Sequence, residues 1–125
     1  MELREYQQRA MTTCTESSNN FSYMMLNLVG EVGELASKVA KRIRKEHIAI
    51  NDNNLANGDK YSELNGNDWE DLFNEMRAEA GDVLWQLSGL CTVMGWHLED
   101  IAEQNLVKLA SRKERNVIVG DGDNR

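Results

Sequence analysis

The chain has 125 residues, no proline and a formal net charge of −7, with a pI of about 4.8. Its length fits one domain, and 41 % hydrophobic residues are enough for one core but not two. The acidic charge repels a nucleic-acid backbone, and no apolar stretch is long and uniform enough to cross a bilayer, so we expect neither a nucleic acid nor a membrane as partner.

The first predicted elements are a short helix over about Leu3–Met11 and a long helix over about Ser22–Lys45. In the long helix, apolar residues recur at helical spacing and form one wide stripe. Two glycines interrupt it, and each costs about 1 kcal/mol relative to alanine, so they call for a packing or ligand explanation. Three residues could cap its start: Asn19, Asn20 or Ser22.

A polar stretch from His47 to Asp68 follows, rich in Asn, Asp and Gly. It is long for a connection inside a compact domain, and we interpret it as a mobile lid or a surface excursion. A third helix is predicted over about Trp69–Met94, with Asp68 as its N-cap and Gly95 as its C-terminal stop.

The last predicted helix covers about Leu98–Glu114, and a tail runs from Asn116 to Arg125. Four helices, two of them long, predict an all-α, four-helix-bundle-like fold with a long polar loop between the two long helices. The expected organisation is one helical domain over residues 1–115 and a C-terminal tail over residues 116–125.

The cysteines and the beginning of the chain favour a cytoplasmic protein. Cys14 and Cys91 do not make a disulfide framework, which fits a reducing compartment. Residues 1–6 show no apolar signal segment. The one basic run, residues 38–45, is interpreted as a solvated helix end, where cations suit the helix dipole.

Two carboxylate pairs carry the chemistry: Glu31 with Glu34, and Glu79 with Asp82. Each pair has spacing i, i+3, which places both side chains on one helix face. A lone pair of this kind is usually a solvated face, but both pairs lie among apolar residues, where like charges repel unless a cation intervenes. If the two long helices pack antiparallel, the four carboxylates can face each other and hold Mg²⁺.

The segments Asn27–Ala36 and Glu79–Trp85 resemble the two signatures of the MazG-type all-α nucleotide pyrophosphohydrolases. The last helix and the tail Gly120–Arg125 are also similar to segments of that superfamily, which includes dUTPases, dCTP pyrophosphatases and phosphoribosyl-ATP pyrophosphatases. Where many members have a further glutamate, this chain has Gly30, a form that resembles the dCTP pyrophosphatase-like branch. The stretch Leu35–Ala78 is longer than usual, and its excess falls in the polar loop.

The resemblance implies hydrolysis of nucleoside triphosphates, with deoxynucleotides favoured, to a nucleoside monophosphate and pyrophosphate. It implies Mg²⁺, with Mn²⁺ as an alternative, held by Glu31, Glu34, Glu79 and Asp82. Metal ions neutralise phosphate charge and lower the pKa of water. Either Glu31 or Glu34 is the expected partner of the attacking water. The family also implies a homodimer or homotetramer.

Positive groups should meet the phosphates, and a neutral amide can join them. The candidates are Lys108 and Arg112 with the amide of Asn105, and more weakly Lys38 and Arg125. Lys108 and Arg112 are four apart and share a helix face. Phe21 and Trp85 are weak candidates for stacking on a base, since each is more often core or interface. Gln86 could contact a base or sugar edge, or only hydrogen-bond to a ligand carboxylate.

Two other interpretations stay open. One is a dUTPase or dCTPase of narrow specificity, which a substrate profile would separate from a broader enzyme. The other is a non-catalytic helical module that uses the fold for dimerisation; its thermal stability would not respond to Mg²⁺ or nucleotide.

Overall fold

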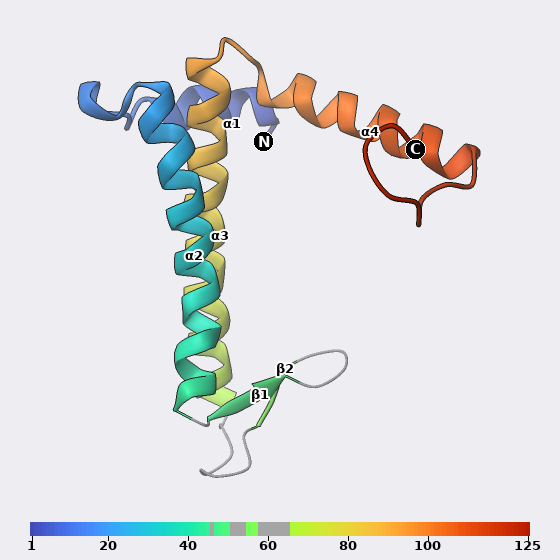
Figure 1. The fold of residues 1–125 in the computed structure, drawn as a ribbon. Helices are drawn as coiled ribbons and strands as arrows, with labels where there is room; N and C mark the ends of the chain where they lie inside the picture. The colour runs from blue at the N-terminus through green and yellow to red at the C-terminus, as the bar shows by residue number, and fades with distance from the viewer. Residues whose placement is uncertain (46, 51–54, 58–65) are drawn as a thin grey trace.

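The computed structural model describes residues 1–45, 47–50, 55–57 and 66–125 (Figure 1). The described part is mainly helical, with only one two-stranded sheet, so the predicted all-α class is confirmed. The helices are α1 (Leu3–Met11), α2 (Phe21–Arg44), α3 (Gly66–Val93) and α4 (Leu98–Glu114), with a short 3-10 turn, η1 (Glu16–Ser18), between the first two. The helices α1 and α4 have the predicted bounds.

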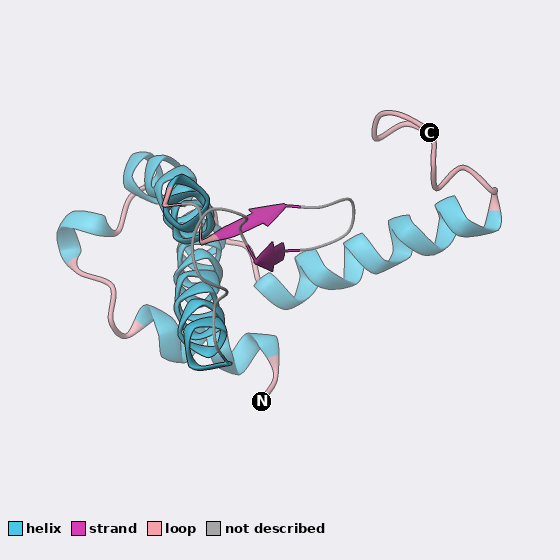
Figure 2. Cartoon of the chain, turned by 90° about the horizontal axis from the view of Figure 1, so that it is seen from below, coloured by secondary structure: helices cyan, strands magenta, loops and turns pink. Residues whose placement is uncertain are grey.

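The long helices α2 and α3 run antiparallel, side by side, and form the body of the molecule (Figures 1 and 2). Met24 of α2 and Leu72 of α3 are fully buried in this contact. A methyl group at Gly89 would collide with the Met24 side chain, so glycine lets the two helices approach here. The two carboxylate pairs could face each other only if the long helices packed antiparallel, and this is the pairing that the structure shows.

Capping groups explain where the long helices begin and end. The side chain of Asn20 accepts a hydrogen bond from Tyr23 N at 2.9 Å, so Asn20 is the residue that caps α2. After α3, Gly95 has a φ of +73°, the left-handed conformation that ends a helix. The helix α3 begins at Gly66, earlier than predicted, so Asp68 lies in its first turn and is not its N-cap; a carboxylate suits the exposed N–H groups there as well.

The prediction of loop alone between α2 and α3 was wrong at two places. The strands β1 (Ile48–Ile50) and β2 (Leu55–Asn57) pair antiparallel, with Ile50 opposite Leu55. Ile48 is buried, which gives the first strand an apolar anchor that its polar surroundings hid in the sequence. The choice between a lid and a surface excursion falls largely on residues 51–54 and 58–65, outside the described residues.

The short helix α1 lies across the end of the α2–α3 pair and ties it to α4. Its buried Gln7 donates to Trp96 O at 3.0 Å and accepts from Leu98 N at 2.8 Å, so one amide joins the end of α3 to the start of α4. Beyond this joint, α4 projects away from the pair (Figures 1 and 2). In the part of the chain that the structure describes, α4 therefore does not close a four-helix bundle with the other helices.

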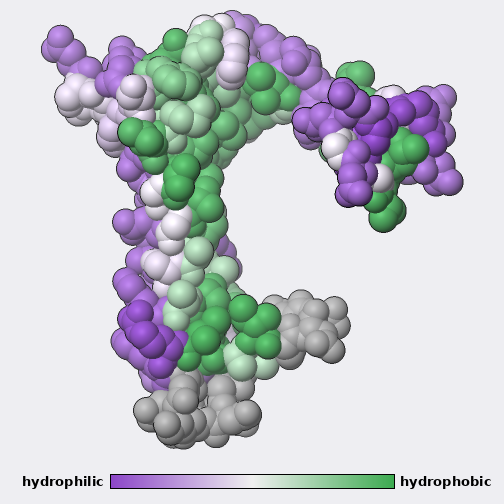
Figure 3. Space-filling model, in the orientation of Figure 1, coloured by the Kyte–Doolittle hydropathy of each residue, from purple (hydrophilic) through white to green (hydrophobic). Residues whose placement is uncertain are grey.

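The open arrangement leaves hydrophobic side chains on the surface. Figure 3 shows hydrophobic groups along the α2–α3 column and on the inner side of the projecting arm. The most exposed of them on the two helices α2 and α4 are Leu26, Val29, Leu106 and Val107. None of the helices in the described ranges has the length and hydrophobicity to span a membrane.

Candidate metal centre

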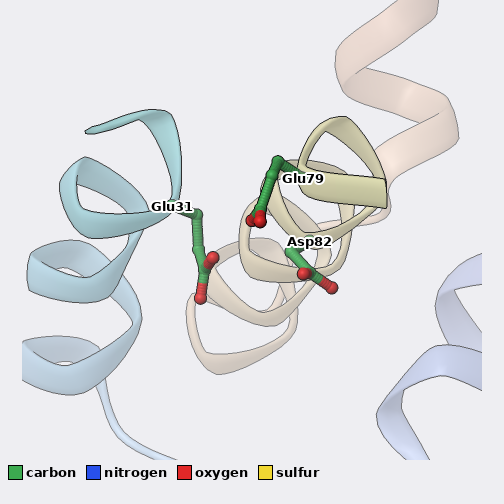
Figure 4. A group of neighbouring side chains, drawn as sticks. All are labelled: Glu31, Glu79 and Asp82. Atoms are coloured by element: carbon green, nitrogen blue, oxygen red, sulfur yellow. The ribbon is translucent and has the colours of Figure 1, made fainter. Parts of the chain in front are cut away.

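Three carboxylates converge between the long helices (Figure 4). Glu31 extends from α2, while Glu79 and Asp82 extend from the same side of α3. One carboxylate oxygen from each lies within 4.8 Å of the others. Glu31 and Glu79 are half-buried and Asp82 is exposed, so the group opens to solvent on one side. We call these three residues the carboxylate cluster.

The local helix geometry explains the convergence. Residues 79 and 82 are three apart, so their side chains project from the same face of α3. The antiparallel contact with α2 then places Glu31 opposite them. An added Cβ at Gly33 or Gly81 would meet no atom within 4 Å, so neither glycine is required by crowding inside the chain.

A lysine supplies part of the charge that the carboxylate cluster needs. Lys38 Nζ lies 3.1 Å from Glu79 Oε1, and both side chains are largely buried. The hydrogen bond to Glu79, followed by its charge, raises the pKa of Lys38, so the ammonium group stays protonated. One ammonium against three carboxylates leaves excess negative charge, and an all-oxygen donor set of this kind fits Mg²⁺ or Mn²⁺.

The fourth predicted ligand, Glu34, stands apart from the carboxylate cluster. Its side chain is exposed. Its charge contributes to the raised pKa of Lys38, which places the Glu34 carboxylate on the Lys38 side of α2. Lys38, predicted as a phosphate contact, is here the ion-pair partner of Glu79.

Two amides lie next to the carboxylate cluster. A hydrogen bond to a ligand carboxylate was one of the two roles predicted for Gln86, whereas Asn27 had no predicted role. Asn27 Nδ2 donates to Glu31 Oε1 at 3.0 Å and to Gln86 Oε1 at 2.9 Å. Gln86, a weak base-binding candidate, is 1 % exposed and donates to Met24 O at 3.3 Å. The spacing of four between Asn27 and Glu31 was the available signal for their contact.

The helix α1 passes close enough to Asp82 for its Tyr6 to be affected by that charge. Burial, and next the charge of Asp82, raise the pKa of the Tyr6 hydroxyl, which places this phenol near the cluster. Periodicity along a nine-residue helix gives no information on which distant residues it will cross, so the sequence offered no signal for Tyr6.

The predicted phosphate contacts Lys108 and Arg112 come together at the far end of α4. Arg112 Nη2 lies 2.9 Å from Asp123 Oδ1, and Lys108 Nζ lies 3.4 Å from the same oxygen. The hydrogen bond from Arg112 is the main cause that lowers the pKa of Asp123. We call these three residues the tail clasp; within one chain it lies away from the α2–α3 pair (Figure 1).

The tail clasp leaves donor capacity unused. Among the described residues, the Nε atoms of Arg112 and Arg125 are buried without a hydrogen-bond partner. Arg125 Nη1 donates to Gly122 O, inside the tail itself. Asn105, predicted to join these cations, is exposed on α4.

The remaining base-binding candidates lie at the α1 end of the pair. Phe21 is the first residue of α2 and is half exposed. Trp85 Nε1 donates to Ala10 O at 3.1 Å and to Thr13 Oγ1 at 2.9 Å, so its indole holds the end of α1 against α3.

Comparison with known proteins gives two matches. A family model described as the MazG nucleotide pyrophosphohydrolase domain matches residues 19–117. The chain is 36 % identical over 110 residues to the Gene 37 protein of Mycobacterium phage L5, an alignment that covers 88 % of this chain and 81 % of that protein. No solved structure matches the chain. The family match includes the carboxylate cluster and the predicted phosphate contacts Lys108 and Arg112.

Proposed function

The chain belongs to the MazG nucleotide pyrophosphohydrolase domain family, and from this premise we propose that it hydrolyses nucleoside triphosphates, with deoxynucleotides favoured, to a monophosphate and pyrophosphate. The resemblance seen in the two sequence motifs is confirmed by the family match. The observation that carries the proposal is the carboxylate cluster, in which Glu31, Glu79 and Asp82 bring oxygens within 4.8 Å of one another.

We propose that the carboxylate cluster, joined by Glu34, holds Mg²⁺, with Mn²⁺ as an alternative. The bound ion supplies positive charge to the phosphates and lowers the pKa of water. Lys38 would leave Glu79 and face the phosphates when a divalent cation takes over its role. The ion pair between Lys38 and Glu79 supports this exchange, because it shows that the carboxylate cluster attracts a cation.

The attacking water needs a group that accepts its proton. Glu31 and Glu34 are the candidates for this role. Glu31 lies in the carboxylate cluster, while Glu34 is exposed on the same helix and near Lys38.

We propose that the active form is a homodimer or homotetramer in which a second copy completes the site. Lys108 and Arg112 belong to α4, which projects away from the α2–α3 pair (Figure 1), so we expect a triphosphate to meet both regions across two copies. The exposed apolar residues of α2 and α4 provide surface that a second copy would cover. Sedimentation at micromolar concentration tests this; a monomer with full activity would contradict it.

We place the reaction in the cytoplasm, where the free thiols of Cys14 and Cys91 would stay reduced.

The decisive assay incubates the full chain with each ribonucleotide and deoxynucleotide triphosphate and Mg²⁺, and follows monophosphate and pyrophosphate. Turnover of several substrates supports the proposal, and turnover of dUTP or dCTP alone narrows it to the specific alternative. A folded sample that hydrolyses none of them contradicts it. Glu79→Gln should abolish activity, while Glu70→Gln, on the exposed part of the same helix, should not.

A further inference from the structure

We propose that Asn27, anchored by Gln86, is a positioning residue that fixes the carboxylate of Glu31 for cation binding. This inference rests on the proposed function, because it assigns Glu31 to a cation site. The two side chains lie next to the carboxylate cluster, Asn27 on α2 and Gln86 on α3.

The hydrogen bonds of Asn27 define its orientation. Its Nδ2 lies 3.0 Å from Glu31 Oε1, 2.9 Å from Gln86 Oε1 and 3.3 Å from Tyr23 Oη. The amide nitrogen carries two hydrogens, which match the two shorter contacts. The flipped amide would place Oδ1 against a carboxylate oxygen, which only accepts hydrogen bonds, so the network fixes this orientation.

Gln86 makes the orientation rigid. It is 1 % exposed, and its Nε2 donates to Met24 O at 3.3 Å. A buried amide has to satisfy both its oxygen and its nitrogen, so Gln86 can turn only by losing contacts on both sides. The position of Glu31 is therefore coupled, through Asn27, to the packing of α2 against α3.

Gly30 makes room for this amide. A Cβ at residue 30 would lie 3.3 Å from Asn27 Oδ1, closer than ordinary van der Waals contact. At Gly33, one turn further along, a Cβ would meet nothing within 4 Å. The same substitution on the same helix should thus disturb Asn27 at one position and leave it alone at the other.

A glutamate without such support would sample several rotamers and would have to be ordered when the cation arrives. Hydrogen bonds to a ligating group remove this cost beforehand, and their loss commonly weakens metal affinity by about 10- to 100-fold. A purely structural role makes a different prediction: loss of the bond would lower the melting temperature and leave cation affinity unchanged.

The test measures Mn²⁺ binding to the full chain, with the free ion counted by electron paramagnetic resonance and no nucleotide present. Mn²⁺ takes the same oxygen ligands as Mg²⁺. Asn27→Ala should raise the dissociation constant by about 10- to 100-fold. Gln86→Met, of similar volume, should raise it by a smaller factor, and the double variant should lose no more than Asn27→Ala alone, since Gln86 acts through Asn27.

Matched controls separate positioning from general damage. Asn74→Ala removes an exposed amide on α3 that accepts from Arg77 at 2.6 Å, and it should leave Mn²⁺ affinity unchanged. Gly30→Ala should weaken Mn²⁺ binding, whereas Gly33→Ala should not. The glycine pair keeps the test decisive if Asn27→Ala fails to fold.

An unchanged dissociation constant in Asn27→Ala and Gly30→Ala would overturn the proposal, as would independent, multiplying losses in the double variant. A wild-type chain that binds Mn²⁺ through this network but hydrolyses no nucleotide would defeat the proposed function and leave the positioning role standing. If Asn27→Ala hydrolyses nucleotides as well as the wild type and binds Mn²⁺ with equal affinity, the positioning role is wrong and the proposed function stands.

Discussion

The proposed function gives a role to two charged centres, the carboxylate cluster and the tail clasp. Their charge balance is opposite. Between α2 and α3, three carboxylates share one nearby ammonium, from Lys38. At the end of α4, two cations share one carboxylate, from Asp123 of the same chain. The first region has negative charge to spare for a divalent cation, and the second has positive charge to spare for an anion.

The two centres also differ in how firmly their groups are held. Amides behind the carboxylate cluster tie Glu31 to both long helices. In the tail clasp, the Arg112 side chain is 6 % exposed and that of Asp123 is 84 % exposed. Asp123 can therefore leave for water, while the buried guanidinium needs another anion in its place. Under the proposed function, these differences would make the carboxylate cluster a rigid cation site and the tail clasp an exchangeable anion site.

The largest expected effect comes from breaking the rigid site. Glu79→Gln should lower kcat/KM at least 100-fold, on the order of the largest losses caused by supporting residues of metal sites. It should also abolish the rise in melting temperature that Mg²⁺ produces, because the ligand linkage is lost. Calorimetry and the pyrophosphate assay measure both, with Glu70→Gln as the control. Retained activity would remove Glu79 from the site.

A smaller effect should follow from weakening the anion site. Arg112→Lys keeps the charge but loses the fork of N–H donors that suits a phosphate, so KM should rise by about tenfold with kcat nearly unchanged. Lys113→Ala, one residue along and exposed, should change neither parameter. An equal fall of kcat in Arg112→Lys would indicate a role at the reacting centre.

Releasing the tail should act in the opposite direction. Asp123→Asn removes the carboxylate that competes with phosphate for Lys108 and Arg112, so KM should fall by up to about fivefold, the scale of an exposed ion pair. Asp121→Asn makes the same charge change two residues earlier and should leave KM unchanged. A higher KM in Asp123→Asn would show that the tail carboxylate supports binding.

The smallest effect concerns pH. The pKa of Asp123 is lowered from its ordinary value of 3.8, chiefly by the hydrogen bond from Arg112. The stability that this contact contributes is present above the ordinary pKa and is lost as pH falls through the lowered pKa. The melting-temperature difference between wild type and Asp123→Asn should be constant from pH 7 to about 5 and should shrink below about 4. A difference that disappears near pH 6 would point to another group.

The helices and part of the carboxylate cluster could be predicted from the sequence, because residue spacing along a helix determines which side chains share a face. The apolar stripes predicted α2 and α3, and the i, i+3 spacing was enough to place Glu79 and Asp82 on one face. The bounds of α1 and α4 were also predicted, from the polar stretch that follows α1 and from the apolar positions along α4. These are properties of one helix at a time.

Contacts between elements could not be predicted in the same way. Gln86 looked like a residue of the ligand cavity, but the crossing of α2 buries it against Met24. The position of Tyr6 near Asp82 depends on where α1 crosses, which periodicity does not encode. In the tail clasp, the chain reverses so that Asp123 contacts Arg112 and Lys108, which lie 11 and 15 positions earlier in the sequence. No sequence motif predicts this contact.

The most direct test of the account is an anomalous difference map from a crystal grown with Mn²⁺ and a non-hydrolysable deoxynucleotide. We expect a peak between Glu31, Glu79 and Asp82, with Lys38 displaced from Glu79. A map in which Lys38 still occupies Glu79, and the manganese binds elsewhere, would contradict it.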